Sequence, residues 1–127
     1  MRKSGVQLPP PRRRRHQGIG GDADLGQPGL SRANLSGAPL GGSNFAHAKL
    51  NRANLNRADL GHVDLSRSDL NNASLIRALL THADLTHANL IRADLHGAFL
   101  NNANLKYANL TNTNLIAADL TDAYLNK

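Results

Sequence analysis

The sequence contains no cysteine, no tryptophan and no glutamate, and aromatic residues make up only 3% of its 127 residues. Without cysteine the chain has neither a disulfide framework nor a thiolate that serves as nucleophile or metal ligand. With so few aromatic rings, a hydrophobic core must be built from aliphatic side chains. No apolar run approaches the ~18 residues that a membrane-spanning helix needs, so we do not expect an integral membrane protein.

The charge is unevenly distributed along the chain. Fifteen Lys and Arg residues outnumber nine acidic residues, which gives a formal net charge of +6. Residues 1–20 hold six of these cations and no acid, whereas residues 21–127 hold nine cations and nine Asp. The chain is therefore basic because of its N-terminal segment, and the remainder is balanced.

The N-terminal segment combines a proline run with four consecutive arginines, Arg12, Arg13, Arg14 and Arg15. Prolines favour an extended path and clustered arginines repel one another, so residues 1–20 are predicted to be a disordered basic tail. Two interpretations are open: a solvated leader without a role, or a tail that binds the phosphates of nucleic acid or of an anionic membrane. The segment lacks the apolar stretch of an export signal, which favours a cytoplasmic protein.

A five-residue repeat occupies residues 21–127. Every fifth residue from Leu25 to Leu125 is leucine, with Phe45 as the single exception, which makes 21 consecutive pentads. The residue two places before each leucine is small, and it is alanine in 16 of the 21 pentads. The residue directly before the leucine is usually Asp or Asn, as in RADL at 57–60.

Neither a helix nor a flat strand accounts for a period of five. In an α-helix a step of five residues turns through about 500°, so successive leucines sweep round the whole circumference. In a strand an odd step places successive leucines on opposite faces. A corner after each pentad resolves the conflict, because Ala and Leu, two residues apart in an extended segment, then all point inward. The repeat therefore predicts a coil whose lumen is filled by Ala and Leu.

Stacked coils can also satisfy the backbone. We expect neighbouring coils to pair at the strand spacing of about 4.8 Å. Asp or Asn near each corner is expected to bond to neighbouring amides, as these side chains do in tight turns. The early pentads match the repeat poorly, with Pro39 and the pair Gly41-Gly42, so we expect regular winding only from about Ala46.

The tandem A-(D/N)-L-X-X pattern, from Asp22 to the C-terminus, resembles that of the pentapeptide-repeat proteins. The resemblance implies an all-β fold, a right-handed quadrilateral β-helix with four pentads in each coil. The 21 pentads then correspond to about five coils. The predicted organisation is a basic tail over residues 1–20 and a β-helix over residues 21–127.

Four pentads per coil place residues 20 apart in one outward column. Arg57 and Arg77 share such a column, and so do Arg32 and Arg52. A stacked arginine pair suits a phosphate or a carboxylate, although most such pairs are only solvated.

Two histidines, His62 and His82, also lie 20 residues apart, so their rings should approach one another. A pair of imidazoles is the beginning of a zinc site, but no third ligand joins the two in the sequence. We therefore expect neither a metal site nor a cofactor.

Apolar residues recur at positions that should face outward. Leu79 and Phe99 occupy the usual Asp/Asn position in adjacent coils, and Ile76 and Ile116 lie near them. A stacked apolar pair on a surface suggests a protein-contact patch. The alternative is a local bend that buries these side chains, and the sequence alone does not decide between the two.

The C-terminal coil is predicted to leave an open edge around an apolar axis. Unpaired edges of repeat proteins favour pairing with another chain. Tyr107, Tyr124 and Leu125 are the candidate residues for a homodimer formed through this end.

The sequence contains no phosphate-cradling loop, nucleophile elbow or metal-ligand triad. A filled rod also offers no deep pocket for a small-molecule substrate. We therefore expect no enzyme activity, but a scaffold that binds an unknown protein partner.

The resemblance adds an alternative, because some pentapeptide-repeat proteins resemble duplex DNA and bind DNA gyrase, although those rods are acidic and this one is balanced. The other alternative is binding of nucleic acid or an anionic membrane through the tail.

Overall fold

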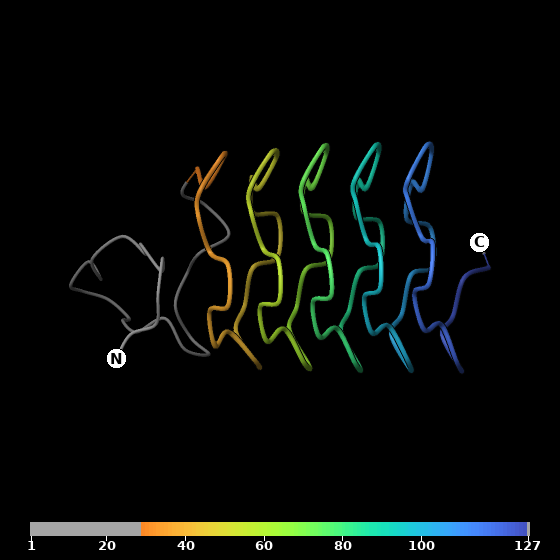
Figure 1. Ribbon diagram of the computed structural model, residues 1–127. Coiled ribbons are helices and arrows are strands. Elements are labelled where there is room, and N and C mark those ends of the chain that lie inside the picture. The colour runs from red at the N-terminus through yellow and green to blue at the C-terminus, as the bar shows by residue number, and fades with distance from the viewer. Residues whose placement is uncertain (1–28, 127) are drawn as a thin grey trace.

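The structure, a computed structural model, describes residues 29–126. Over this range the chain has neither a helix nor a continuous strand; two-residue turns alternate with single bridged residues at a period of five. Residues 29–126 therefore contain no helix that could span a membrane. Figure 1 shows these residues wound as a stack of coils along one axis.

The register between coils is constant. Every bridge is parallel and joins residues 20 apart, from Gly29 with Lys49 to Asn104 with Tyr124. The bonds run in both directions from each coil: Leu60 donates its N–H to Leu79 O at 2.7 Å, and Leu79 donates to Ala58 O at 3.0 Å. Four pentads therefore separate the residues that stack on one another in adjacent coils.

A type II turn forms the corner after each pentad. In the first described turn, Ala33 N–H donates to Leu30 O at 3.0 Å, and Arg32, the third residue, has a φ of 64°. A positive φ at the third residue alone defines type II. The same left-handed conformation recurs every five residues through Asp122, and 16 of these corner residues are not glycine. An L-residue in this region costs about 1–2 kcal/mol, so the fold tolerates repeated local strain.

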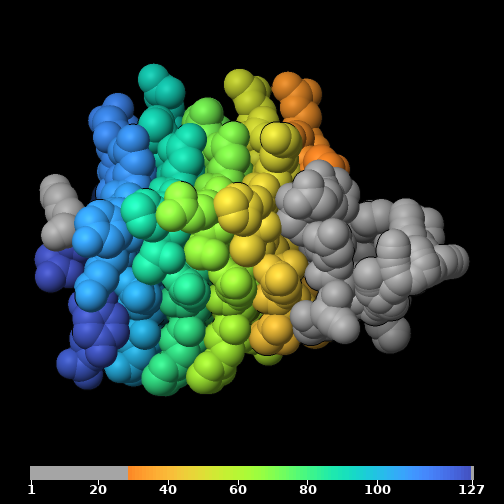
Figure 2. Space-filling view, turned by 180° about the vertical axis from the view of Figure 1, so that it is seen from behind, coloured from red at the N-terminus to blue at the C-terminus, as the bar shows by residue number. Residues whose placement is uncertain are grey.

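The lumen is filled by the two inward positions of each pentad. The buried Leu and Ala residues, together with Phe45 and Val63, are each at most 5% exposed. Ser68 takes an alanine position, and its hydroxyl donates to Leu65 O at 2.7 Å, so its polar group is satisfied. The coils pack against one another as continuous bands (Figure 2), and the predicted aliphatic core is confirmed.

Asp and Asn side chains brace the corners as the sequence predicts. In 13 pentads the Oδ1 atom of the residue before the leucine accepts the N–H two residues later, as from Ala46 to Asn44 at 2.9 Å. Each such bond contributes about 0.5–1.5 kcal/mol. The short polar residue therefore stabilises the entry to the turn that follows it.

Regular winding begins earlier than predicted. Pro39 bridges to Asp59 and Asn44 to Asp64, and Gly42 lies at a corner with a φ of 75°. At the same position one coil later, the Asp59 N–H points towards the preceding coil and bonds to Ala38 O. Proline lacks this N–H, so Pro39 loses no bond to the following coil. Gly42 suits its corner because glycine adopts positive φ without strain. The expectation of an irregular first coil was therefore wrong over the described residues.

Candidate functional site

The outward side chains form four faces, one for each pentad of a coil. Each face carries the residue before the leucine along its centre and the turn residues along its two edges. Because coils repeat every 20 residues, each of these positions becomes a column that runs the length of the rod. The predicted site residues can therefore be placed by column.

One face carries an apolar patch, defined here as Ile76, Leu79, Phe99 and Ile116. Leu79 and Phe99 are 42% and 39% exposed, and Ile116 is 67% exposed, whereas Ile76 is half-buried. A parallel bridge joins Leu79 to Phe99, so the chain follows its regular path here. The alternative of a local bend that buries these residues is wrong, and the patch faces outward.

Leu79 and Phe99 of the patch stand where the repeat usually has an Asp or Asn that makes a stabilising hydrogen bond. Asp59 and Asp119 occupy the same column as Leu79 and Phe99, and they accept N–H bonds from Gly61 at 3.2 Å and Thr121 at 3.1 Å. Aliphatic and aromatic side chains have no oxygen for this bond. Leu79 and Phe99 therefore lack the corner hydrogen bond and expose apolar surface to water.

Arg77 lies at the edge of the patch and reaches over the next coil. A Cβ atom added to Gly97 would lie 3.4 Å from Arg77 Cγ. The aliphatic stem of Arg77 therefore packs over the space that a side chain at position 97 would occupy. The guanidinium of a snorkelling arginine remains available for an anionic partner. Gly97 also lies at a corner with a φ of 68°, which glycine adopts without strain.

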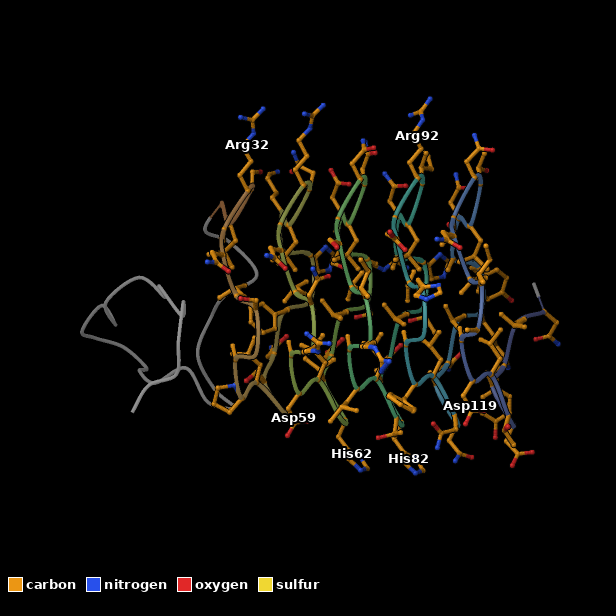
Figure 3. The ribbon with its side chains drawn as sticks, in the orientation of Figure 1. Arg32, Asp59, His62, His82, Arg92 and Asp119 are labelled. Atoms are coloured by element: carbon orange, nitrogen blue, oxygen red, sulfur yellow. The ribbon has the colours of Figure 1, made fainter. Side chains whose placement is uncertain are left out.

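The structure places Arg57 and Arg77 in adjacent corners of one column, both exposed. A second corner column, at the other edge of the neighbouring face, holds Arg32, Arg52 and Arg92. Arg32 and Arg52 were predicted to share a column, whereas Arg92 was not predicted to join them, although its spacing of 40 residues from Arg52 identifies it as a member of the same column. Figure 3 shows Arg32 and Arg92 pointing away from the rod on the same side, opposite His62 and His82.

Two aromatic stacks lie along other columns. The rings of His62 and His82 are 4.7 Å apart with an interplanar angle of 5°, and those of His87 and Tyr107 are 4.7 Å apart with an angle of 14°. The nitrogen lone pairs of an imidazole lie in its ring plane, so parallel rings do not converge on one metal ion. No group of three potential ligands from His, Cys, Asp and Glu occurs within the described part of the chain.

Tyr107, Tyr124 and Leu125 are exposed near the C-terminal end of the described residues. Tyr124 pairs through its backbone with Ala103 and Leu105, and Lys106 Nζ lies 5.9 Å from the centre of its ring. The three residues are therefore on the surface, but whether they contact a second chain remains a prediction.

Asp119, in the last described coil, has a lowered pKa. The Thr121 hydroxyl donates to Asp119 Oδ1 at 2.6 Å, and together with the Thr121 N–H it lowers the pKa of Asp119 below its ordinary value. Hydrogen bonds to a carboxylate favour its charged form. This is the behaviour of a braced turn and does not by itself point to catalysis.

Four predicted anion contacts, Arg12, Arg13, Arg14 and Arg15, lie outside the described residues, as does the boundary between the tail at 1–20 and the β-helix. Both remain predictions from the sequence.

Comparisons with known proteins agree with this geometry. The family model for pentapeptide repeats (8 copies) matches residues 30–67, 68–106 and 93–127. The crystal structure of alr5209, a pentapeptide repeat protein from Nostoc PCC 7120, is similar at 38% identity and a TM-score of 0.60, over 66% of this chain and 74% of that one. AT2G44920, a pentapeptide repeat protein from the Arabidopsis thaliana thylakoid lumen, is similar at 30% identity and a TM-score of 0.62, over 82% and 71% of the two chains.

More distant matches do not extend to function. QnrB1, a plasmid-mediated fluoroquinolone resistance protein, shares 20% identity at a TM-score of 0.41, over 72% of this chain and 58% of that one, which is too low to bear on partners. No curated protein sequence matches the chain. The repeat, its register and the family match together show that the chain belongs to the pentapeptide-repeat family.

Proposed function

We propose that this protein is a non-catalytic scaffold that binds a protein partner through the apolar patch. In this proposal the chain forms a right-handed quadrilateral β-helix of about five coils, as the related structures support. The lumen is filled by aliphatic side chains, so a partner would contact the outer faces of the rod. Such a shape suits recognition of a surface better than enclosure of a small substrate.

The observation that carries the proposal is the exposure of Leu79 and Phe99 at a position where the repeat normally places Asp or Asn. Both residues forgo the corner hydrogen bond that Asp59 and Asp119 make in the same column. Stability is commonly given up at sites that serve binding. Phe and Arg are also enriched at the centres of protein interfaces, and Arg77 lies beside this pair.

The composition of the patch predicts the chemistry of its partner. Aliphatic and aromatic side chains should bury against an apolar segment, and Arg57 and Arg77 at the edge should pair with carboxylates. We therefore expect a partner that presents apolar residues flanked by Asp or Glu.

The test is capture from a lysate of the cells that produce the protein, with the full chain immobilised. We compare the wild-type chain with the Leu79→Asp/Phe99→Asp variant and with an Asn89→Asp/Asn109→Asp control. The control adds the same two charges in adjacent coils of another face and keeps the Oδ1 atoms that bond to Ile91 and Thr111. A protein retained by the wild type and control but absent from the patch variant supports the proposal. A partner retained equally by all three chains refutes it.

Regulation of DNA gyrase is the alternative suggested by the family resemblance. Mimicry of DNA requires a strongly negative surface, whereas residues 29–126 carry eight Lys and Arg against seven Asp. The charge therefore favours the scaffold. A gyrase supercoiling assay with the full chain at two salt concentrations tests the alternative: regulation of gyrase predicts an effect that persists at higher ionic strength, whereas an effect caused by arginines that coat the DNA is lost as the salt rises.

We also propose a contact between two copies of the chain through Tyr107, Tyr124 and Leu125. All three side chains are exposed at one end of the described rod, and aromatic residues are enriched at interfaces. Sedimentation of the full chain, with Tyr124→Asp/Leu125→Asp as comparison, tests this contact. A concentration-dependent dimer that the substitutions do not weaken would contradict it.

A further inference from the structure

Positive charge is concentrated on the two edges of one face. Residues 29–126 contain eight Lys and Arg residues, and five of them border this face. One edge carries the corner residues Arg32, Arg52 and Arg92, and the other carries Arg57 and Arg77. We name these two rows and the surface between them the arginine face.

The arginine face is nearly free of negative charge. Its centre column reads Asn34, Asn54, Ser74, Asp94 and Asn114, so Asp94 is the single acid among seven Asp in the described range. Asp94 Oδ1 already accepts bonds from Asn114 Nδ2 and from the His96 N–H, both at 3.0 Å. Asp59 and Asp119 lie on the side of the rod away from Arg32 and Arg92 (Figure 3), so these two acids are remote from the row that contains Arg32 and Arg92.

The polar groups on this face are mainly hydrogen-bond donors. Guanidinium groups have five N–H donors and no acceptor, and they stay charged at any physiological pH. Asn34 and Asn54 use Oδ1 to accept the N–H of Ser36 and Asn56, at 3.2 and 3.0 Å, which leaves the amide NH2 as the donor that each can offer to a ligand. A surface of donors and permanent cations matches a ligand rich in anionic acceptors, as phosphates are.

The spacing of the two rows distinguishes between phosphate-bearing ligands. Within a row, neighbouring coils are separated by about 4.8 Å, so each row is a straight line of guanidinium groups parallel to the rod axis. The backbones of the two corners are roughly 10 Å apart, the length of three extended residues, and the arginine side chains project outward from them. Two lines of cations suit a ligand that carries many phosphates in rows, as a duplex does, better than a single phosphate group.

We propose that the arginine face binds the phosphate backbone of duplex nucleic acid, with one arginine row on each strand. Binding of this kind is independent of sequence and releases counterions, so it weakens steeply with salt. The site lies on a different face from the apolar patch, apart from the shared edge at Arg57 and Arg77. The inference therefore goes beyond the proposed scaffold role and does not depend on it.

The row of Arg32, Arg52 and Arg92 permits a clean test because it does not touch the apolar patch. We would measure the fluorescence anisotropy of a short labelled DNA duplex with the full chain and with the Arg32→Asn/Arg52→Asn/Arg92→Asn variant. Asparagine already occupies this corner column at Asn72 and Asn112, with φ values of 61° and 58°, so the fold should be kept. Circular dichroism melting verifies this. The matched control, Lys49→Asn/Arg67→Asn/Lys106→Asn, removes the same charge from other faces.

We expect the affinity of the arginine-row variant to fall at least about tenfold near 50 mM salt, and its salt slope to fall by about 0.9 for each phosphate that the variant no longer neutralises. The affinity of the control should fall much less. Equal reductions in variant and control would show that only net charge matters and would overturn the proposal. Binding abolished by Arg12→Gln/Arg13→Gln/Arg14→Gln/Arg15→Gln, yet unaffected by the arginine-row variant, would overturn it as well. So would binding to phosphatidylserine vesicles without binding to the duplex.

Discussion

Leu79 and Phe99 are bridged through their backbones in adjacent coils, and both side chains stand outward between Asp59 and Asp119 in the same column. The column thus changes from acidic to apolar and back to acidic along the rod. Asp64 and Asp84, bridged in the same way on another face, show that two carboxylates can occupy adjacent coils. The apolar pair is therefore not required by the fold.

The first prediction concerns the stability of Leu79→Asp/Phe99→Asp. Each introduced carboxylate can accept the N–H two residues later, a bond of about 0.5–1.5 kcal/mol, whereas repulsion from Asp59 or Asp119 in the same column costs up to about 1 kcal/mol, so the free energy of unfolding should change by less than about 1 kcal/mol. Urea unfolding followed by circular dichroism measures it. Leu80→Ala, one residue away in the lumen, is the comparison and should cost about 2–5 kcal/mol. A patch variant as unstable as Leu80→Ala would mean that these side chains belong to the core.

The second prediction tests the lumen. Ala83 is 1% exposed and faces inward, so Ala83→Trp should overpack the coil and destabilise it by about 1–3 kcal/mol or more. Arg77→Asn, at an exposed corner, should change the free energy of unfolding by less than about 0.5 kcal/mol. Thermal melts of both variants measure this difference in stability. Equal tolerance of substitution at the two positions would exclude a filled lumen.

The third prediction uses the strained corners. Ala117 has a φ of 64°, so Ala117→Gly should relieve strain and stabilise the protein by about 1 kcal/mol. Its neighbour Ala118 packs against the core and is absent from the positive-φ positions, so Ala118→Gly should destabilise by about 0.5–1 kcal/mol. Urea unfolding of the two variants should therefore show shifts of opposite sign. Destabilisation by both would mean that the corner carries no strain.

The fourth prediction concerns pH. Because the pKa of Asp119 is lowered by Thr121, its stabilising contribution is present above the ordinary carboxyl pKa and is lost as the pH falls through the lowered value. Thr121→Val removes the hydroxyl donor and should raise the pKa of Asp119 towards its ordinary value. Carbon-detected NMR titration of the carboxyl group measures this change. Thr86→Val, which removes the equivalent hydroxyl beside Asp84, should leave the pKa of Asp119 where it is.

Much of the fold follows from the sequence because the repeat is local. The step of five residues, the small residue two places before each leucine, and the Asp or Asn directly before it predict inward side chains and braced corners. The structure confirms these at residues such as Ala83, Leu85 and Asn44. The exception is the first coil, where Pro39 and Gly42 depart from the repeat in sequence although their places in the coil suit proline and glycine.

The candidate site was less accessible to sequence reasoning. A period of five does not state how many corners close a coil, so the column that each outward residue joins depends on a register of 20 residues. Leu79 and Phe99 stand out in the sequence as unusual, but only their exposure excluded a buried bend. Arg92 was not grouped with Arg32 and Arg52, because the column is interrupted by Asn72.

The sequence by itself determined which side chains fill the lumen and where the chain turns, because burial and turn preference act within one pentad. Only the tertiary structure decided which outward residues become neighbours, since that depends on hydrogen bonds between coils 20 residues apart. The apolar patch and the two arginine rows are products of that register. Shifting the stacking by a single pentad would leave every leucine in the lumen and would separate Leu79 from Phe99.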